Sequence, residues 1–272
     1  MSLPRSNAPA DFHAIAVDAA IAGAEAIRKL RGGAPLDTVR LGVSDKGGVE
    51  DFVTAADFAA EEAVVAVIRR ARPDDRIIAE ESGLHDGSSD VEWYVDPLDG
   101  TANFIADKPA YAVSVAACRQ DRTIASAVYR PADRRWLATA PEGSLQGNLA
   151  PGANDRDSLS SATISLSRPH EPGRYREAML LLEALLPTVA AERRVGSAAC
   201  ALLEVATGRL DAYVSVDIPR WDTAAGHLLV ERAEGCVRTV RLGSGTPVCI
   251  AAGPSLARLL EREVTRQFPP TS

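Results

Sequence analysis

One short segment of the sequence places two aspartates three positions apart, directly after an apolar run. The run Trp93–Val95 precedes Asp96, and Pro97 and Leu98 separate it from Asp99. A strand that ends at Asp96, followed by a turn stiffened by Pro97, can bring both carboxylates to one point. Two such hard oxygen anions favour a hard divalent cation. An Asx-turn, in which the aspartates only cap backbone amides, is the alternative that this spacing allows.

Gly100 and Thr101 follow this pair and could complete a phosphate site. If they open a helical turn, its free N–H groups face the same point as the carboxylates and can hold phosphate oxygens. The hydroxyl of Thr101 completes the set.

Three further acidic positions could contribute, although each has a structural alternative. Glu80 follows the apolar run Ile77–Ala79, so its carboxylate can point off a strand end, but acids in such places are usually solvated surface. Asp57 follows Thr54 at the spacing of a capping box. Asp222 precedes an apolar helical pattern, where the helix N-cap is its default role.

The elements that would position these residues follow from apolar periodicity. Two amphipathic helices come first, one from 11 to 30 and one from Thr54 to the residue before Pro73. Short β-type runs follow, which we expect to be neighbouring antiparallel strands, at Ile77–Ala79, Trp93–Val95, Tyr111–Cys118, Thr123–Tyr129 and Trp136–Ala140.

The later part of the chain alternates strand and helix, which predicts mixed sheets covered by helices. Strands are predicted at Ala162–Ser167, Ala212–Val216 and Pro247–Ala252. Helices are predicted at Tyr175–Leu186, Ala198–Thr207 and Asp222–Ala233, and from Ser255 onward. The polar, aperiodic stretch 146–161 is the predicted boundary between two halves.

Four segments together resemble the motifs of the inositol monophosphatase-like superfamily of metal-dependent phosphatases. They occur in the order and at the separations typical of that family, at Asp51–Asp57, Ile78–Gly83, Asp96–Phe104 and Trp221–Gly226. The resemblance runs from about Lys46 to Gly235, and Asp96–Phe104 is its most specific part. It implies an α/β protein of the α+β type, folded as the layered αβαβα sandwich of inositol monophosphatase and fructose bisphosphatase.

The resemblance also implies a role for each matching position. Residues 1–150 would form a helix pair and an antiparallel sheet with most metal ligands, and residues 151–272 an α/β half with Asp222 and the substrate-contacting segments. Two or three Mg²⁺ ions would be bound by Glu80, Asp96, Asp99, Asp222 and the carbonyl of Leu98, with Asp96 bridging. The attacking water would be oriented by Thr101, supported by Asp57, in a catalytic set that includes Glu80 and Asp99.

Substrate contacts are implied in the same way. The backbone amides of Gly100 and Thr101 would hold the phosphate. The remainder of the substrate would contact Gly196, Ser197, Ala198, Ser215 and Asp222. Lys46 would lie on a mobile loop near the metals.

Composition narrows the function classes. A formal charge of −7 over 272 residues, without a Lys/Arg-rich block, disfavours nucleic acid as a partner. No apolar stretch reaches the length of a membrane span, and residues 1–10 do not resemble a signal peptide, so we expect a cytoplasmic protein.

The four cysteines form no C-x-x-C pair and are interpreted as reduced core thiols. His227 lies five positions beyond Asp222 on a predicted helix, which turns it away, and it is interpreted as structural.

Position 215 departs from the inositol-phosphate pattern. Seven residues before Asp222, family members selective for inositol phosphates carry a glutamate that binds ring hydroxyls, and here that residue is Ser215. Asp217 or Arg220 could read the substrate instead, or either could be a solvated loop charge. Substrate identity is therefore left open.

The expected function is Mg²⁺-dependent hydrolysis of a small phosphorylated alcohol, with inositol phosphate as the first candidate. The resemblance adds inhibition by Li⁺ and a homodimer. The alternatives within the class are 3′-phosphoadenosine 5′-phosphate, histidinol phosphate, fructose bisphosphate or another sugar phosphate. A non-catalytic regulatory relative, or a structural cation site in a protein of other activity, would be an alternative from a different class.

Overall fold

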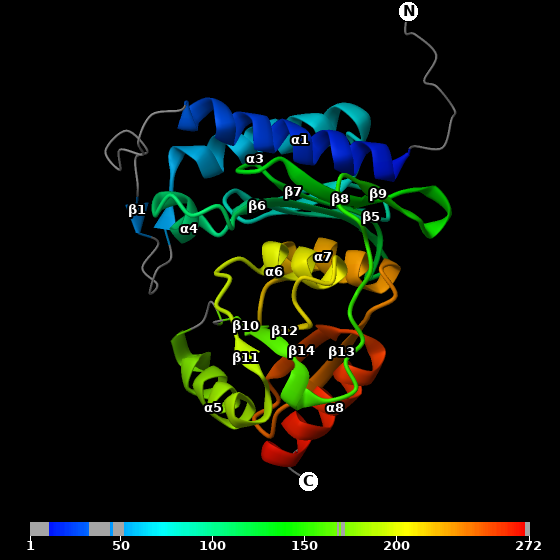
Figure 1. Ribbon diagram of the computed structural model, residues 1–272. Coiled ribbons are helices and arrows are strands. Elements are labelled where there is room, and N and C mark those ends of the chain that lie inside the picture. Colours follow the sequence, from blue (N-terminus) through cyan, green and yellow to red (C-terminus); the bar gives the residue numbers. More distant parts are fainter. Residues whose placement is uncertain (1–10, 33–43, 46–51, 168, 170–171, 270–272) are drawn as a thin grey trace, which may run out of the picture.

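The computed structural model describes residues 11–32, 44–45, 52–167, 169 and 172–269. Helical and sheet layers alternate through the molecule, beginning and ending with helices (Figure 1). This arrangement confirms the predicted layered αβαβα sandwich. Lys46 lies outside the described residues.

The first layer is a helix pair, α1 (Phe12–Arg31) and α3 (Ala55–Ala71). Asp11 caps α1 by accepting hydrogen bonds from the amides of the second and third residues that follow it. The apolar face of each helix consists mainly of alanine, valine and isoleucine and is buried against the first sheet. Both helices therefore begin within a residue of their predicted starts.

The first sheet has seven strands in the spatial order β4, β3, β5, β6, β7, β8, β9. Their bounds are Gly83–His85, Arg76–Ala79, Val91–Asp99, Ala112–Arg119, Arg122–Arg130, Arg135–Thr139 and Leu145–Gly147. The expectation that the strands pair only in antiparallel fashion is wrong for β3 and β5, which are parallel, with Ile77 opposite Trp93. Because parallel neighbours end at the same sheet edge, Glu80 and Asp96 leave that edge side by side.

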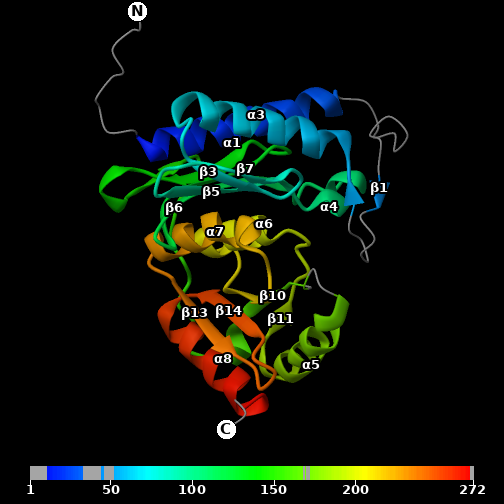
Figure 2. The ribbon, with the colours of Figure 1, turned by 180° about the vertical axis from the view of Figure 1, so that it is seen from behind.

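The second sheet has five strands in the order β11, β10, β12, β14, β13. Their bounds are Ala191–Glu192, Thr163–Leu166, Ala212–Val216, Pro247–Ala252 and Cys236–Arg241. Between the two sheets lie α6 (Ala198–Ala206) and α7 (Arg220–Arg232), and α5 (Tyr175–Leu185) and α8 (Pro254–Gln267) cover the outer face (Figure 2). Every residue of α6 except Glu204 is buried, as a helix between two sheets requires.

The remaining elements are short. They are β1 (Ser44–Asp45), β2 (Phe52–Val53), α4 (Thr101–Ile105) and 3₁₀ turns at Pro141–Gly143, Leu159–Ser161, Pro172–Arg174 and Leu186–Thr188.

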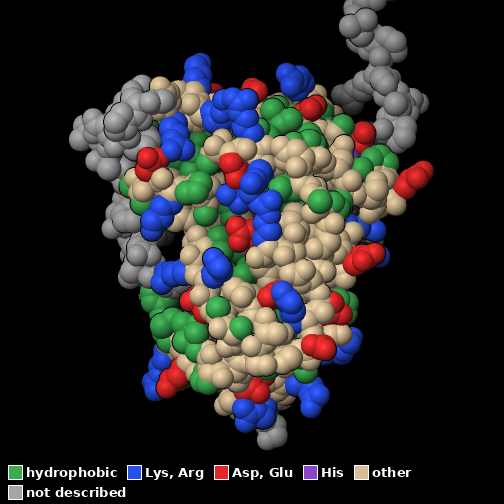
Figure 3. Space-filling view, viewed as in Figure 1, with side chains coloured by type: hydrophobic (Ala, Val, Ile, Leu, Met, Phe, Trp, Pro, Cys, Tyr) green, Lys and Arg blue, Asp and Glu red, His purple; other side chains and the backbone are tan. Residues whose placement is uncertain are grey.

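Hydrophobic clusters fill the space on each side of the first sheet and within the second half. No described helix is long and apolar enough to cross a membrane. Basic and acidic side chains are interspersed on the face in Figure 3.

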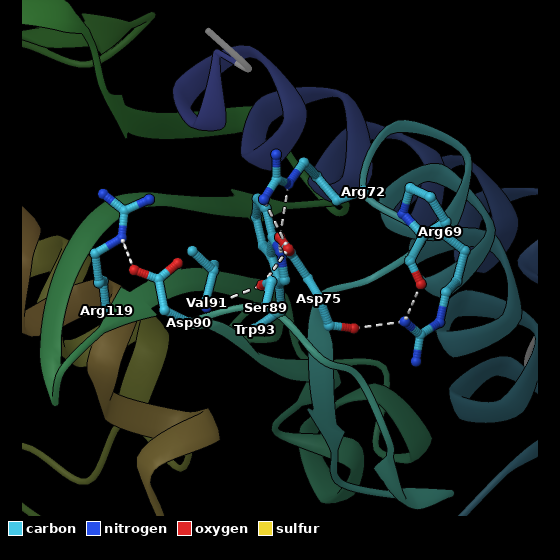
Figure 4. Close-up of polar contacts among 9 residues, drawn as sticks. Arg69, Arg72, Asp75, Ser89, Asp90, Val91, Trp93 and Arg119 are labelled. Atoms are coloured by element: carbon cyan, nitrogen blue, oxygen red, sulfur yellow. Dashed lines mark hydrogen bonds and ion pairs between the residues drawn. The ribbon is translucent and has the colours of Figure 1, made fainter. Parts of the chain in front are cut away.

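A buried carboxylate fixes the far ends of β3 and β5 (Figure 4). Asp75 accepts two hydrogen bonds from Arg72, at 2.9 and 2.8 Å, and one each from Ser89 Oγ and Trp93 Nε1. Burial opposes its ionisation, but these donors outweigh burial and hold the pKa of Asp75 below its usual value. The network fixes the register of two strands whose opposite ends carry the acids of the candidate site.

Candidate active site

Four acidic side chains from three elements line one cavity of about 720 Å³. Glu80 directly follows β3, and Asp96 and Asp99 lie at the carboxyl end of β5. Asp222 lies in the first turn of α7. Leu98, Gly100 and Thr101 line the same cavity. The structure therefore brings together every residue that was predicted as a metal ligand.

Asp96 lies at the centre of this acidic cluster and is 1% exposed. Its Oδ1 accepts a hydrogen bond from the amide of Leu98, so the Asx-turn considered from the sequence does form. Burial first, and then the charges of Glu80, Asp99 and Asp222, raise the pKa of Asp96 well above its usual value. A hydrogen bond with the Glu80 carboxyl group acts in the same direction. Asp96 is both a turn cap and a partner in a cluster of like charges.

Asp99 is held by the N-terminus of α6. Its Oδ2 accepts hydrogen bonds from Ser197 Oγ, at 2.7 Å, and from the backbone amide of Ala199. Burial and the nearby charge of Asp222 nevertheless raise the pKa of Asp99 to about 7. A carboxylate from the first sheet is thus positioned by a helix of the middle layer.

Asp57 combines a structural role with a contact to the cavity. It forms the predicted capping box of α3 with Thr54, accepting from both the amide and the hydroxyl of that residue. Its other oxygen lies 3.0 Å from Thr101 Oγ1, which is also 3.1 Å from the carbonyl of Leu98. Burial raises the pKa of Asp57 to about 6, despite these hydrogen bonds.

Asp222 is not the N-cap of its helix, so the structural alternative considered for it does not apply. α7 begins two residues earlier than expected, at Arg220, with Pro219 as the cap residue, so Asp222 is the third residue of the first turn. Its negative charge is favourable there because free amides give this end of a helix a partial positive charge. Ser114 Oγ donates a 3.0 Å hydrogen bond to the carbonyl of Trp221, which ties this turn to β6.

Gly100 satisfies two requirements of the turn between β5 and α4. Its φ of +92° lies in the region that favours glycine. A Cβ atom there would lie 2.8 Å from the carbonyl oxygen of Ala110 and 3.0 Å from Ser197 Cβ. The first bond within α4 is donated by Phe104 to Gly100, so the amides of the first turn remain outside the helix's own hydrogen bonds.

The donor chemistry of the cavity fits Mg²⁺, since it consists of carboxylates and a carbonyl oxygen. Within the described residues, however, no group of three or more acidic, histidine or cysteine side chains has the geometry of a formed metal site. Burial, and then repulsion among the carboxylates, raise the pKa values of Asp96 and Asp99, and a bound cation would relieve the repulsion between their ionised forms. The residues fit the ion by type and placement, and binding would require the carboxylates to close around it.

The predicted substrate contacts are partly brought to this cavity. Gly196, Ser197 and Ala198 line it. Ser215 is buried in β12 opposite Cys249 and is not among the lining residues. Tyr213, two residues earlier on the same face of the strand, lines the cavity instead, because its side chain is much longer.

The two alternatives considered for Ser215 lie elsewhere. Asp217 is 3.5 Å from Arg174 Nε in an ion pair. Arg220 stacks on the ring of Tyr94, 4.6 Å from its centroid, and donates a hydrogen bond to Asp121. Neither side chain lines the cavity. His227 is also absent from the lining, and burial lowers its pKa to about 4, in agreement with its structural interpretation.

Two residues that support the site were not singled out from the sequence. Glu61 is 5% exposed and accepts 2.9 Å hydrogen bonds from the amides of Glu81 and Ser82, which fixes the loop that follows Glu80. Asn103 donates hydrogen bonds to the carbonyls of Ala110 and Val195. An acid on the apolar face of a predicted helix, four residues after Asp57, was the available signal for Glu61.

Comparison with known proteins agrees with this geometry. A sequence profile of the inositol monophosphatase family matches residues 9–266. The chain is 42% identical over 195 residues to a protein of Salmonella typhimurium named Nus factor SuhB, which covers 70% of this chain and 72% of the relative. It is 36% identical over 193 residues to an inositol-1-monophosphatase of Mesorhizobium japonicum, covering 70% and 73%.

Solved structures show the same fold. The extragenic suppressor protein suhB of Bartonella henselae matches with a TM-score of 0.82 and 30% identity, covering 93% of this chain and 98% of the other. Inositol monophosphatase of Anabaena matches with a TM-score of 0.77 and 30% identity, covering 95% and 96%.

Proposed function

The chain belongs to the inositol monophosphatase family, and from this premise we propose that it is a Mg²⁺-dependent phosphatase acting on a small phosphate monoester. The observation that carries the proposal is the cavity in which Glu80, Asp96, Asp99 and Asp222 meet the Thr101–Asp57 pair. A non-catalytic relative would have no need to keep all of these groups facing one cavity.

Glu80, Asp96, Asp99, Asp222 and the carbonyl of Leu98 would hold the metal ions. A dianionic phosphate ester resists attack because its negative charge repels the nucleophile. When bound, Mg²⁺ neutralises part of this charge and lowers the pKa of water. Asp99 would enter such a set through its second oxygen, because its Oδ2 is already engaged by α6.

Thr101 and Asp57 would orient the attacking water. When Asp57 is ionised it accepts a hydrogen bond from the Thr101 hydroxyl, which leaves the lone pairs of Oγ1 available to a water molecule in the cavity. Thr54 keeps the Asp57 carboxylate in place through two further hydrogen bonds. The pair thus fixes the direction of the water's own lone pairs toward the phosphorus atom.

The turn at Gly100 and Thr101 would hold the phosphate oxygens through its amides, with the ester oxygen directed toward Gly196–Ala198. The N-terminus of α6 adds partial positive charge beside this position. We also propose the homodimer that the family resemblance implies and the cytoplasmic location expected from the sequence, and gel filtration of the purified protein tests the dimer.

The test is phosphate release from a panel of monoesters in Mg²⁺, in chelator and after Mg²⁺ is restored. The panel should contain inositol 1-phosphate, glycerol 2-phosphate, histidinol phosphate and 3′-phosphoadenosine 5′-phosphate. We expect activity that disappears in chelator and returns with Mg²⁺. Turnover at the full rate in metal-stripped protein, or none with any ester, contradicts the proposal.

A second candidate function comes from the names of several relatives. Proteins named Nus factor SuhB from Salmonella, Pasteurella and Haemophilus are 36–42% identical to this chain. The role of a Nus factor would not need the cavity chemistry, so the two functions can be separated. A Thr101→Ala variant without phosphatase activity that still replaces SuhB in a Salmonella strain lacking it would favour this second role.

A further inference from the structure

The helix end that carries Asp222 has no side-chain cap. The residue before α7 is Pro219, which makes no capping hydrogen bond through its side chain. Helix ends that lack such a cap tend to fray. Asp222 lies in this first turn, whereas the other acids of the cavity lie at the carboxyl edge of the first sheet. Contacts outside the helix must therefore fix Asp222 relative to those acids.

Arg220, the first residue of α7, connects this helix end to the first sheet. Its guanidinium group lies over the ring of Tyr94, 4.6 Å from the ring centroid. It also donates hydrogen bonds to the carboxylate of Asp121, at 2.9 Å, and to the carbonyl oxygen of the same residue, at 3.1 Å. The flat face of the guanidinium group and its forked edge are thus used together. A basic residue in a first helical turn is otherwise unfavourable, because it faces the partial positive charge of that end.

Tyr94 belongs to the strand that carries the central acid of the cavity. It lies two positions before Asp96 in β5 and therefore on the same face of the sheet. On the neighbouring strand β6, Ser114 is the register partner of Asp96, and its hydroxyl donates the 3.0 Å hydrogen bond to the carbonyl of Trp221. The first turn of α7 is therefore held at two points by neighbours of Asp96 in the sheet.

Arg220 does not itself enter the cavity. Successive residues of an α-helix are turned by about 100°, so the side chains of Arg220 and Asp222 point about 200° apart. Arg220 is accordingly not among the lining residues. It can influence Asp222 only through the backbone of the turn that they share, or through its charge at a distance.

We propose that Arg220 is a positioning residue that sets Asp222 for metal binding by tying the first turn of α7 to Tyr94 of the first sheet. The inference rests on the proposed phosphatase function and on the metal site assigned to it. If the turn is held in place before the metal arrives, binding does not have to order it. If the turn frays, the apparent Kd for the metal rises in inverse proportion to the fraction of molecules in which Asp222 is in place.

Positioning and charge predict opposite results when Arg220 is replaced. The positive charge of Arg220 repels a cation, so Arg220→Gln would tighten Mg²⁺ binding if only its charge mattered. Loss of positioning would instead weaken Mg²⁺ binding. The usual strength of a contact between a cation and a ring corresponds to an effect of about five- to tenfold.

The chain supplies a matched control on the face of the first sheet that α1 covers. Arg119 lies over the ring of Phe12, 5.7 Å from its centroid, and forms a 3.0 Å ion pair with Asp90 (Figure 4). Its side chain is 43% exposed, compared with 38% for Arg220. Arg119→Gln and Arg220→Gln therefore remove the same charge and the same kinds of contact, but only the second releases α7.

Calorimetric titration of the metal-free proteins with Mg²⁺ measures the effect without any substrate. We expect the Mg²⁺ concentration at half-saturation to rise about five- to tenfold in Arg220→Gln and to change less than about twofold in Arg119→Gln. Arg220→Lys keeps the charge but cannot make both hydrogen bonds beside the ring, so its affinity should be intermediate. Thermal unfolding in chelator should show that the two glutamine variants are folded and equally stable.

The ring contact is tested from its other side with Tyr94. Tyr94→Phe keeps the ring and should keep the Mg²⁺ affinity of wild type, whereas Tyr94→Leu should weaken binding about as much as Arg220→Gln does. In the double variant of Tyr94→Leu and Arg220→Gln the two effects should not add, because both substitutions remove the same contact.

The outcomes separate this proposal from the phosphatase function. Mg²⁺ affinity in Arg220→Gln that equals or exceeds that of wild type, or that falls equally in Arg119→Gln, overturns the positioning role alone. Failure to hydrolyse any ester, with the expected order of Mg²⁺ affinities, contradicts only the phosphatase function. A wild-type protein that binds no Mg²⁺ contradicts both.

Discussion

Replacing Asp99 with asparagine separates the charge of this residue from its hydrogen bonds. Asparagine is nearly the same shape, and its amide oxygen can still accept from Ser197 Oγ and the Ala199 amide. The substitution removes one of the negative charges that meet in the cavity. We therefore expect Asp99→Asn to stabilise the metal-free protein and to impair metal binding.

The magnitude follows from the burial of this carboxyl group. Its pKa rises from its usual 3.8 to about 7, which corresponds to a cost of up to about 4 kcal/mol for the ionised folded form at pH 8. Because neighbouring acids share this repulsion, we expect the free energy of unfolding in chelator to increase by about 2–4 kcal/mol. In a chain of 272 residues that gain raises the Tm by roughly 4–7 °C.

Urea denaturation at pH 8, in chelator and in Mg²⁺, measures both effects. Mg²⁺ at a hundred times its Kd should stabilise wild type by about 2.7 kcal/mol, and Asp99→Asn much less. The control Ser197→Ala removes a hydrogen bond to Asp99 and keeps every charge, so it should destabilise the protein in chelator. If the free energy of unfolding of Asp99→Asn instead falls by about 1 kcal/mol in chelator and its kcat is retained, Asp99 is only a cap for α6.

Three further predictions use neighbouring groups. Thr101→Ala should lower kcat by about 10²–10³-fold with Mg²⁺ affinity in calorimetry unchanged, and Thr101→Ser should restore most of the rate, because only the hydroxyl is needed. Burial raises the pKa of Asp57 to about 6, so the folded state holds this proton more tightly than the unfolded state; the stability of metal-free protein should therefore fall as pH rises from about 4 to about 6, and a slope that is unchanged in Asp57→Asn would contradict this. Ser215→Ala should leave kcat/KM within about twofold on every ester in the panel, because Ser215 does not line the cavity; a selective loss on inositol 1-phosphate would show a direct contact.

The local parts of this site were predictable from the sequence. A strand followed by Asp96-Pro97-Leu98-Asp99-Gly100 specifies a turn through proline, glycine and Asx chemistry, and all of these act within a few residues. The capping box at Thr54 was predictable for the same reason. The family resemblance then assigned Asp222 to the same site, which spacing alone could not do.

Features that depend on distant partners were not predictable in the same way. The parallel pairing of β3 with β5 is decided by the sheet as a whole, and a short apolar run carries no mark of its direction. The strand Cys236–Arg241 was missed because it is only partly buried and carries two arginines. The place of Tyr213 in the cavity, rather than Ser215, depends on how far each side chain extends from a shared strand face.

The attachment of Asp99 to α6 has a consequence for local unfolding. Ser197 and Ala199 hold this carboxylate from a helix that packs between the two sheets, and Asp222 is on the adjacent helix of that layer. If the α6–α7 layer opened, Asp99 would lose its donors and the cluster would lose Asp222 in the same event. Amide hydrogen exchange in α6 and α7 should therefore slow together when Mg²⁺ is added, although most of the acidic residues come from the first sheet.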